Sequence, residues 1–374
     1  MRSNSHLRRL TGIFFMGLIL SWCSAEAGFA AADRSLAALQ QEVAEAGRIN
    51  PPWGGPRNGP PGQRDKRIAV LCEDLRNGGV LGVAKGIEEA ARELRWQVKI
   101  YDAGGSPSGR NQAVAAALAA TPDGLLLIGT DATALTKQLR LFEQRKIPVV
   151  GWHVAAEAGP LPGTPVAMNV STDPLAVARV TAAAAVVAAQ GRAGVVIFTD
   201  SNFAIATAKA DAMAAVIRDC PDCSLLEIRD LAISDCAEQM PRATSQLLKA
   251  YGPRWTYALA INDIYFDYAT PELITAGELA DNLRFLSAGD GSSAAFMRIA
   301  SGIYQVGTVA EPLNMHGWQL VDELNRLLAG QPVSGYIFPV HLVTPENVEF
   351  DGGARYHFDP DNGYRDIYRQ IWRH

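Results

Sequence analysis

The stretch RIAVLCEDLRNGGVLGVAKGIEEAAREL, residues 67–94, contains the structural unit from which the rest of the chain is built. Residues 68–72 form an uninterrupted apolar run, which is typical of a buried strand. Gly78 and Gly79 then precede apolar residues at helical spacing, and a second short strand is predicted at 97–101. Strand, helix and strand in this order predict a βαβ unit, whose carboxyl-terminal corner is the usual position for a ligand.

The same alternation of short apolar strands and helices continues to a last predicted strand at 336–342. Alternation of this kind predicts an α/β fold with doubly wound parallel sheets. About eleven strands are too many for one compact sheet with short connections, so we expect two lobes. The predicted lobes comprise residues 66–172 with 312–338, and residues 173–311 with 339–374.

Residues 1–32 have the features of a cleaved signal peptide. Arg8 and Arg9 supply positive charge, residues 10–22 form an apolar run too short to span a bilayer, and small residues follow. We therefore expect export to the periplasm. Lipid attachment at Cys23 and a twin-arginine signal are the alternatives.

Residues 33–65 separate this signal from the first predicted strand. Residues 33–50 predict a short amphipathic helix. The following PPWGGPRNGPPG, residues 51–62, has five prolines and four glycines, which exclude helix and strand. A disordered leader and a strap packed on the first lobe both fit this composition.

The overall composition excludes some classes of partner. The chain has 374 residues, is 48% hydrophobic and carries a formal charge of −5, with acidic and basic residues interspersed. This size suits two domains with a large core. Basic residues gather nowhere, so we expect no nucleic-acid partner, and we expect a monomer.

Export to an oxidising compartment favours disulfide bonds. Cys220 and Cys223 have CxxC spacing, but no second pair of zinc ligands lies nearby. The pair follows a predicted helix end, whereas a thioredoxin-like pair precedes a helix. We predict a structural disulfide between Cys236 and either Cys220 or Cys223, and a buried free thiol at Cys72.

Signatures of common enzyme classes are missing. The sequence contains no GxSxG, HExxH or GxxxxGK[ST], and no GxGxxG follows the first strand. We therefore expect no enzymatic activity, no cofactor and no metal site. An exported enzyme that uses Asp290 or Glu311 as general acid or base is the alternative.

Polar or aromatic residues follow the ends of many predicted strands. In parallel sheets these ends meet at one edge, so such residues from two lobes would face a common cleft. Some also have a purely structural interpretation, because Asp173, Asn262 and Asp290 could cap helices. The candidate ligand-binding residues are Asn77, Trp152, His153, Asp173, Phe203, Lys209, Asn262, Asp263, Asp290 and Glu311.

Four short phrases carry a family resemblance. They are GIEEAA (86–91), AIND (260–263), AGDG (288–291) and GTVAEP (307–312), the last followed by Gly317. With them, the chain from Lys66 to about Asn347 resembles the type I periplasmic solute-binding proteins of ABC transporters, in particular the ribose-type sugar-binding family. The resemblance implies two doubly wound parallel-sheet lobes that are joined by a three-strand hinge and close on a ligand.

The resemblance also implies roles for single residues. Asn262 and Asp290 match the family's ligand-binding amide and carboxylate, and Asn77 lies at the contact after the first strand. Glu311 lies where a glutamine or similar polar residue is common, and Lys209 where arginine is usual.

The chain departs from the family at two corners. Trp152 and His153 replace an Asp-Arg pair, and Gly78, Gly79 and Val80 replace an aromatic pair. The ligand is therefore left open. The excess of acidic candidates over a single basic candidate favours a neutral polyhydroxy or cationic ligand.

The implied function is periplasmic binding of a small polar, sugar- or polyol-like solute for delivery to an inner-membrane ABC permease. The leader helix and strap also resemble the extension of autoinducer-2-binding relatives that serve a sensor kinase. A sensory binding protein that reports its ligand to a membrane kinase or chemoreceptor is therefore the alternative.

Overall fold

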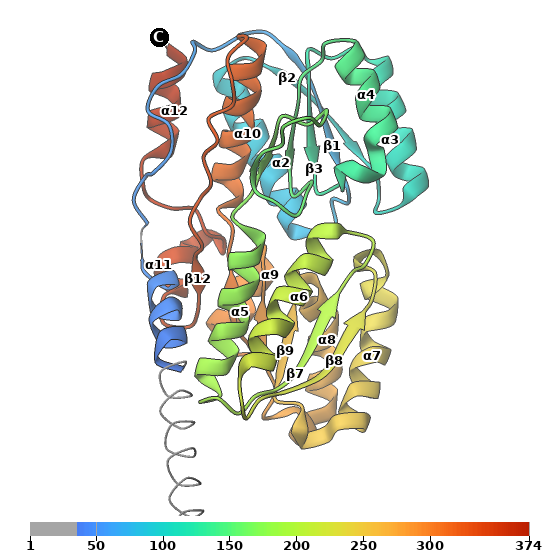
Figure 1. Ribbon diagram of the computed structural model, residues 1–374, viewed down its shortest axis with the longest axis vertical. Helices are drawn as coiled ribbons and strands as arrows, with labels where there is room; N and C mark the ends of the chain where they lie inside the picture. Colours follow the sequence, from blue (N-terminus) through green and yellow to red (C-terminus); the bar gives the residue numbers. More distant parts are fainter. Residues whose placement is uncertain (1–35, 50, 374) are drawn as a thin grey trace, which may run out of the picture.

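The computed structural model describes residues 36–49 and 51–373, which form two α/β lobes placed end to end (Figure 1). The expected signal peptide, residues 1–32, lies outside the described residues. Among the described helices, none has the length and apolar character needed to cross a membrane. Each lobe contains a six-stranded, mostly parallel sheet, which confirms the predicted fold class.

The sheet of the N-terminal lobe has the order β2-β1-β3-β4-β6-β5, and only β5 pairs antiparallel. Its strands are β1 (Arg67–Cys72), β2 (Gln97–Asp102), β3 (Gly124–Ile128), β4 (Val149–Trp152), β5 (Gly159–Pro160) and β6 (Met168–Val170). The helices on this lobe are α2 (Gly78–Glu93), α3 (Pro107–Ala119), α4 (Thr136–Gln144), α10 (Leu313–Leu328) and α12 (Tyr364–Arg373).

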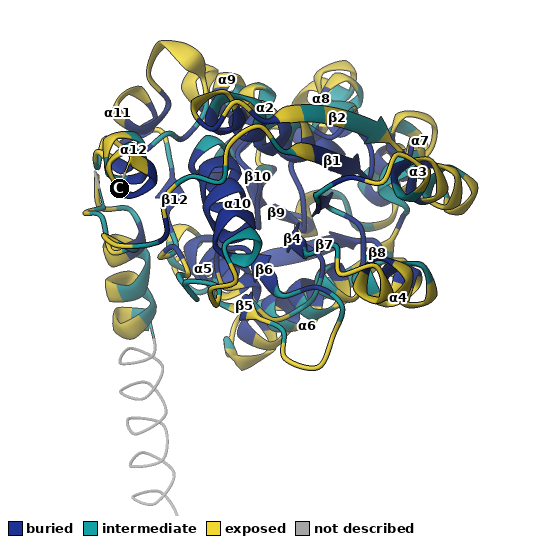
Figure 2. Cartoon of the chain, turned by 90° about the horizontal axis from the view of Figure 1, so that it is seen from above, coloured by how far each residue is buried: buried dark blue, intermediate teal, exposed yellow. Residues whose placement is uncertain are grey.

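Strand β1 explains how this lobe buries both faces of its sheet. Ile68 and Val70 pack with residues of α2 and α10, whereas Ala69 and Leu71 pack with residues of α3 and α4. Successive side chains of a strand point to opposite faces, so a sheet covered on both sides needs an uninterrupted apolar run. Figure 2 shows the result as dark, buried strands inside a rim of helices with exposed outer faces.

The sheet of the C-terminal lobe has the order β12-β11-β10-β9-β7-β8, and only β12 pairs antiparallel. Its strands are β7 (Gly194–Thr199), β8 (Ser224–Asp230), β9 (Tyr257–Ala260), β10 (Arg284–Ser287), β11 (Gln305–Val309) and β12 (Leu342–Val343). The helices on this lobe are α5 (Pro174–Ala188), α6 (Ala204–Asp219), α7 (Cys236–Tyr251), α8 (Ile264–Ala276), α9 (Ser293–Ser301) and α11 (Val348–Gly352).

Three crossings of the chain join the lobes: β6 to α5, β11 to α10, and α10 to β12. The last crossing differs from the prediction. A strand was expected at 336–342, but only Leu342 and Val343 pair with β11. Pro339 lies inside the expected strand and cannot donate a ladder hydrogen bond.

The leader helix and the strap lie along the hinge side of the molecule. Helical residues 36–46 pack on the C-terminal lobe, where Glu42 accepts from Arg179 at 2.7 Å. The strap, residues 51–62, then packs on the N-terminal lobe. Its Trp53 ring lies 5.3 Å from that of Tyr336 and 5.4 Å from that of Tyr368. Of the two interpretations of this segment, the packed strap is correct.

The C-terminal tail corrects the predicted lobe boundary. Residues 339–374 were assigned to the C-terminal lobe, but α12 packs on α10 of the N-terminal lobe, beside the strap (Figure 1). Its buried side chains Tyr364, Tyr368 and Trp372 lie one turn apart and stack around Trp318. An amphipathic helix must bury its apolar face, and α10 offers the matching aromatic surface.

The predicted disulfide with Cys236 is wrong. Cys220 is bonded to Cys223, with their Cα atoms 5.3 Å apart, in the turn between α6 and β8. Cys236 is a buried free thiol at the start of α7, and its burial raises its pKa. The partners are adjacent because a turn brings residues three apart within disulfide range. Cys72 is a buried free thiol, as predicted.

Candidate functional site

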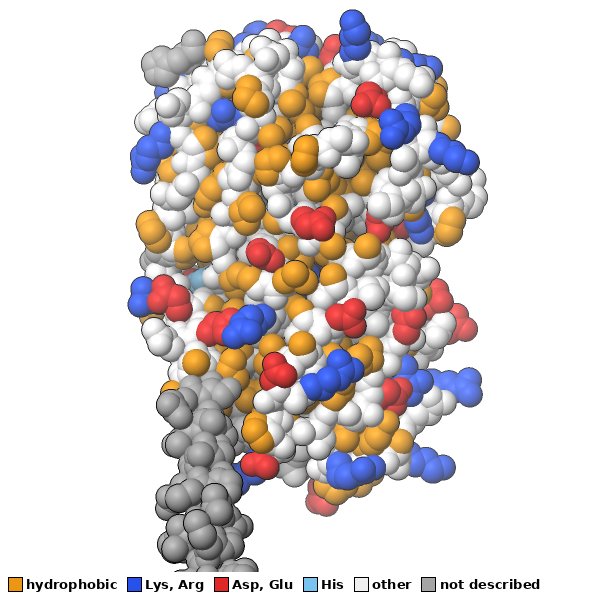
Figure 3. Space-filling model, viewed as in Figure 1, with side chains coloured by type: hydrophobic (Ala, Val, Ile, Leu, Met, Phe, Trp, Pro, Cys, Tyr) orange, Lys and Arg blue, Asp and Glu red, His pale blue; other side chains and the backbone are white. Residues whose placement is uncertain are grey.

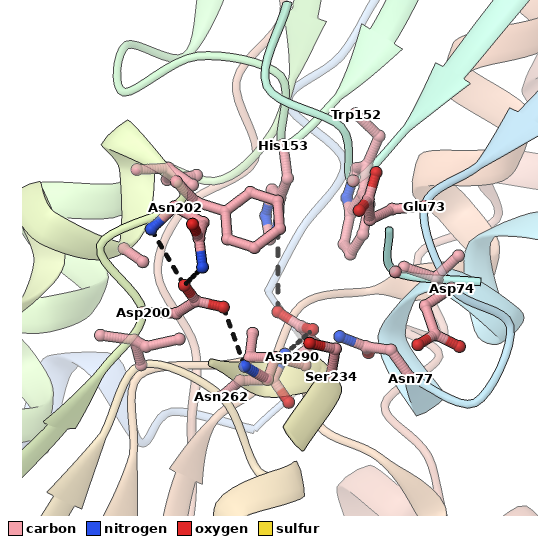
Figure 4. A pocket seen from close by; sticks show the side chains of 18 of the residues that line it. Glu73, Asp74, Asn77, Trp152, His153, Asp200, Asn202, Ser234, Asn262 and Asp290 are labelled. Atoms are coloured by element: carbon pink, nitrogen blue, oxygen red, sulfur yellow. Dashed lines mark hydrogen bonds and ion pairs between the residues drawn. The ribbon is translucent and has the colours of Figure 1, made fainter. Parts of the chain in front are cut away.

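A cavity lies between the two lobes, at the carboxyl ends of strands from both sheets. Its volume is about 90 Å³, several times the minimum of about 10–15 Å³ that a single water needs. Figure 4 shows side chains from both lobes converging on it. The corners that line it follow β1 (Glu73, Asn77), β4 (Trp152, His153), β7 (Asp200, Phe203), β9 (Asn262) and β10 (Asp290).

Asp290 is the buried carboxylate of the C-terminal lobe in this cavity. Its Oδ2 accepts from Asn262 Nδ2 at 2.6 Å, and its Oδ1 lies 3.8 Å from His153 Nδ1 of the other lobe. Burial raises the pKa of Asp290 to about 6, although the charges of His153 and Lys209 lower it. A group that donates a hydrogen bond to Oδ1 would compensate for this loss of hydration.

His153 is positioned by Glu311, a residue of the hinge. Its backbone is in the left-handed region, with φ 52°, and its Nε2 lies 2.8 Å from Glu311 Oε1. The ring also stacks on Trp152, with centroids 3.8 Å apart. Glu311 Oε2 lies 3.1 Å from His316 Nδ1. Burial alone would raise the pKa of Glu311, but the two histidines hold it well below its usual value.

Lys209 supplies a buried positive charge from α6. Its Nζ donates to the carbonyl oxygen of Ala288 at 2.7 Å and contributes a favourable charge to Asp290. An ammonium group has three donors, and Ala288 uses one. Among the described residues no second hydrogen-bond partner of Nζ is present.

The N-terminal lobe contributes an amide and an ion pair. Asn77 caps α2 through its Oδ1, which accepts from Gly79 N at 2.8 Å and leaves its amide N–H groups available. Glu73 accepts from Thr130 Oγ1 at 2.8 Å and lies 3.2 Å from Arg110 Nε. Burial raises the pKa of Glu73, and the Thr130 hydrogen bond and Arg110 partly offset the rise.

The two lobes touch at the rim of the cavity. A Cβ atom added to Gly79 of α2 would lie 2.2 Å from Asp290 Oδ2, and one added to Gly78 would lie 2.8 Å from Ser292 Cβ. Asp131 Oδ2 of the N-terminal lobe accepts from Ala204 N at the start of α6. The lobes are therefore in a closed arrangement, with a glycine pair at the point of closest approach.

Seven of the ten candidate residues line the cavity, and three do not. The seven are Asn77, Trp152, His153, Phe203, Lys209, Asn262 and Asp290. Asp173 is an exposed N-cap of α5. Asp263 is buried, but its carboxylate binds Gly291 N and Gln305 Nε2. Glu311 lies beneath the cavity and positions His153.

Other lining residues were not among the candidates. Asn202, Ser234 and Arg110 lie one or more residues beyond a strand end, in loops or in a first helical turn. Ile205 and Ile233 also line the cavity. No motif marks these positions. Only Ile233 and Ser234 had a usable signal, because they lie in the loop after β8, which shares the cavity edge with the loop after the neighbouring strand β7.

Comparison with known proteins assigns the fold to one family. The family model described as periplasmic binding protein domain matches residues 68–332. A search of curated proteins finds no match to this chain.

Solved structures give the same architecture. An ABC transporter solute-binding protein from Agrobacterium vitis with bound allitol is 19% identical, with TM-score 0.66 over 76% of this chain and 97% of that one. One from Mycobacterium smegmatis with bound glycerol is 19% identical, with TM-score 0.68 over 79% and 99%. The XylFII-LytSN complex matches with 14% identity and TM-score 0.65 over 75% and 98%.

Proposed function

The chain belongs to the periplasmic binding protein family, and from that premise we propose that it binds one small polar solute between its lobes. The bound solute is delivered to an inner-membrane ABC permease. The chain works in the periplasm after removal of its signal peptide. Solute-binding proteins of this architecture have been solved with allitol and with glycerol, which supports a hydroxylated solute of similar size.

The observation that carries the proposal is the set of polar groups with unused hydrogen-bonding capacity that both lobes place around one enclosed space. Asn77 and His153 come from the N-terminal lobe, and Lys209 and Asp290 come from the C-terminal lobe. Donors and an acceptor lie side by side, and a hydroxyl group both donates and accepts. A ligand bound here satisfies both lobes at once, so its binding energy favours the closed arrangement.

Binding without chemical change is the simpler use of this cavity. The hydroxyl of Ser234 donates at 3.1 Å to the exposed carboxylate of Asp235, which is a weak base in water and not the histidine of a nucleophile–base pair. We therefore expect the solute to leave unaltered. Mass spectrometry of each solute after incubation with the protein checks this expectation.

A thermal-shift panel of sugars, polyols, small alcohols, amines and nucleosides tests the proposal, followed by calorimetry of each positive compound. A ligand at 100 times its dissociation constant should raise the free energy of unfolding by about 2.7 kcal/mol. Asp290→Ala should remove most binding because it deletes the buried acceptor. Asp173→Ala is the control, since Asp173 is exposed and lies outside the cavity.

Wild-type affinity in Asp290→Ala would refute the assignment of the cavity. A complete absence of stabilising compounds in the panel would count against the proposed solute class. Uptake of the positive compound by cells with and without the gene then tests delivery to a permease.

A sensory role is the second candidate. The leader helix and strap lie on the surface across both lobes, so a partner that touches them would detect closure. A structurally similar chain has been solved in the XylFII-LytSN complex. Loss of a transcriptional response, with normal uptake, in cells that lack the gene would favour this role over transport.

A further inference from the structure

Several polar side chains that line the cavity are already used within the protein. Asp200 Oδ1 accepts from the backbone and side chain of Asn202 at 2.9 and 2.8 Å, and its Oδ2 accepts from Ile233 N at 2.8 Å. Asp74 is bound by the Arg76 guanidinium at 2.6 Å. A ligand therefore finds fewer available acceptors than the number of lining carboxylates suggests, because the lone pairs of these two carboxylates already have partners.

Apart from Glu73 and Arg110, which lie 3.2 Å apart as an ion pair, the groups that keep unused capacity gather around Asp290. Asn77 lies two residues from Gly79, whose backbone meets the Asp290 carboxylate. His153 Nδ1 is 3.8 Å from Asp290 Oδ1, and Lys209 binds the carbonyl oxygen of Ala288, two residues before Asp290. In the sheet order, Asp290 follows β10, which is next to the hinge strand β11. The ligand's hydrogen bonds are therefore concentrated at the hinge end.

Three apolar side chains of the C-terminal lobe form one wall at the outer end of the cavity, beside the polar lining residues Asn202 and Ser234. Phe203 and Ile205 lie after β7, and Ile233 lies after β8, the edge strand farthest from the hinge. All three are only half-buried although they face the cavity. Ile205 lies outside all three apolar core clusters. Val80 and Ile261 extend the same surface as buried side chains. We call Phe203, Ile205 and Ile233 the outer apolar wall.

We propose that the ligand is amphiphilic, with hydroxyl groups at the hinge end and a methyl or short alkyl group against the outer apolar wall. This inference rests on the proposed function and narrows its solute class. A 6-deoxyhexose or an alkanediol has the required distribution, whereas a fully hydroxylated polyol places a hydroxyl against the wall. A hydroxyl held against these three side chains loses water and gains no hydrogen bond from them, which costs affinity.

Matched pairs of compounds test this distribution by calorimetry on the full mature chain. The pairs are L-rhamnose with L-mannose, L-fucose with L-galactose, and 1,2-butanediol with erythritol. Each CH₂ or CH₃ group buried against the wall should strengthen binding about fourfold. The alkyl-bearing member of at least one pair should therefore bind at least about tenfold more tightly, once the uncompensated hydroxyl of its partner is included.

Two variants test whether the preference for the alkyl-bearing compound depends on the outer apolar wall. Ile205→Ser should reduce the preference for the alkyl-bearing member to about threefold or less, because it replaces apolar surface by a hydroxyl. Ile274→Ser is the control, since Ile274 is 61% exposed on α8 of the same lobe and lies outside the cavity. It should leave the preference at its wild-type value. Both variants are first checked for a cooperative thermal transition.

The outcomes separate this inference from the proposed function. If the fully hydroxylated member binds as tightly as its partner in every pair, the amphiphilic ligand is refuted and solute binding stands. A preference in Ile205→Ser that is as large as in the wild type also refutes it. If no member of any pair binds and the wider panel is also negative, both proposals fall.

Discussion

Gly79→Ala adds one methyl group at the point where the lobes touch. The Cβ atom would lie 2.2 Å from Asp290 Oδ2, 2.6 Å from its Cγ and 2.7 Å from its Cβ. The whole Asp290 side chain is involved, so rotation of the carboxylate alone does not relieve the overlap. The backbone of Gly79 is helical, so alanine is allowed and raises the intrinsic helix propensity of α2 by about 0.5–1 kcal/mol.

The expected effect is on closure rather than on folding. Ordinary contact needs about 3.5–4 Å, so the lobes must stay about 1 Å farther apart at this point. Overpacking of this kind costs about 1–3 kcal/mol. Because only the closed arrangement contains the overlap, the variant should bind its ligand about fivefold to 150-fold more weakly. The free energy of unfolding of the ligand-free protein should not fall.

Calorimetry with a positive compound from the thermal-shift panel measures the affinity. Small-angle scattering with and without that compound measures the compaction on binding. The variant should show weaker binding and a smaller compaction on saturation. Gly54→Ala is the matched control, since its added Cβ would make an ordinary 3.6 Å contact with Tyr336. Binding within twofold of wild type, together with full compaction, would refute the reasoning that lobe contact at Gly79 is part of the bound state.

Three further predictions follow from the hinge, the cavity and the strap. Glu311→Gln should lower the free energy of unfolding by about 3–5 kcal/mol, because it removes the buried carboxylate that binds His153 Nε2 and lies beside His316 Nδ1; an unchanged urea midpoint would contradict this. Burial raises the pKa of Asp290 from 3.8 to about 6, so the folded state binds its proton more tightly. The free energy of unfolding should fall by up to about 3 kcal/mol as pH rises through this window, a slope that Asp290→Asn should lack in urea titrations. Trp53→Ala should cost about 2–3 kcal/mol in the same titrations without changing ligand affinity, and a loss of affinity alone would show that the strap acts on the cavity.

Much of the cavity lining could be predicted from sequence because the position of strand ends is a property of the sheet rather than of single residues. In each sheet the parallel strands end at one edge, which brings Asn77 near His153 and Asn262 near Asp290, and the closing of two lobes that the family resemblance implies brings the two edges together. The glycine pair of α2 was visible too, although its role in lobe contact required the coordinates.

The errors have a common physical cause, which is that neighbouring residues at a corner face different ways. Asn262 faces the cavity, but Asp263, one residue later, turns to Gly291 N and caps the loop after β10. Glu311 depends on a histidine 158 positions away in the chain, and no local pattern records that contact. Such long-range pairs are fixed by tertiary packing and could not be predicted from spacing.

Surface charge gives no comparable guide to the site. On the face shown in Figure 3, acidic and basic side chains are interspersed over both lobes, which agrees with their mixture along the sequence. The charges that matter are buried between the lobes. The strand ends determine where these buried groups lie. Their capacity to bind a ligand depends on whether they already have hydrogen-bond partners within the protein.

The leader helix, the strap and the C-terminal tail lie on the hinge side, and their position determines where the lobes can separate. The leader helix packs on the C-terminal lobe and the strap on the N-terminal lobe, while α11 and α12 of the tail repeat this division. Two segments therefore cross the hinge side in addition to the three crossings. Two lobes that are connected on the hinge side separate most on the opposite side, which is where the outer apolar wall lies. Opening exposes that wall to water and closure on an apolar group covers it, so the hydrophobic effect acts at the end of the cavity where lobe separation is greatest.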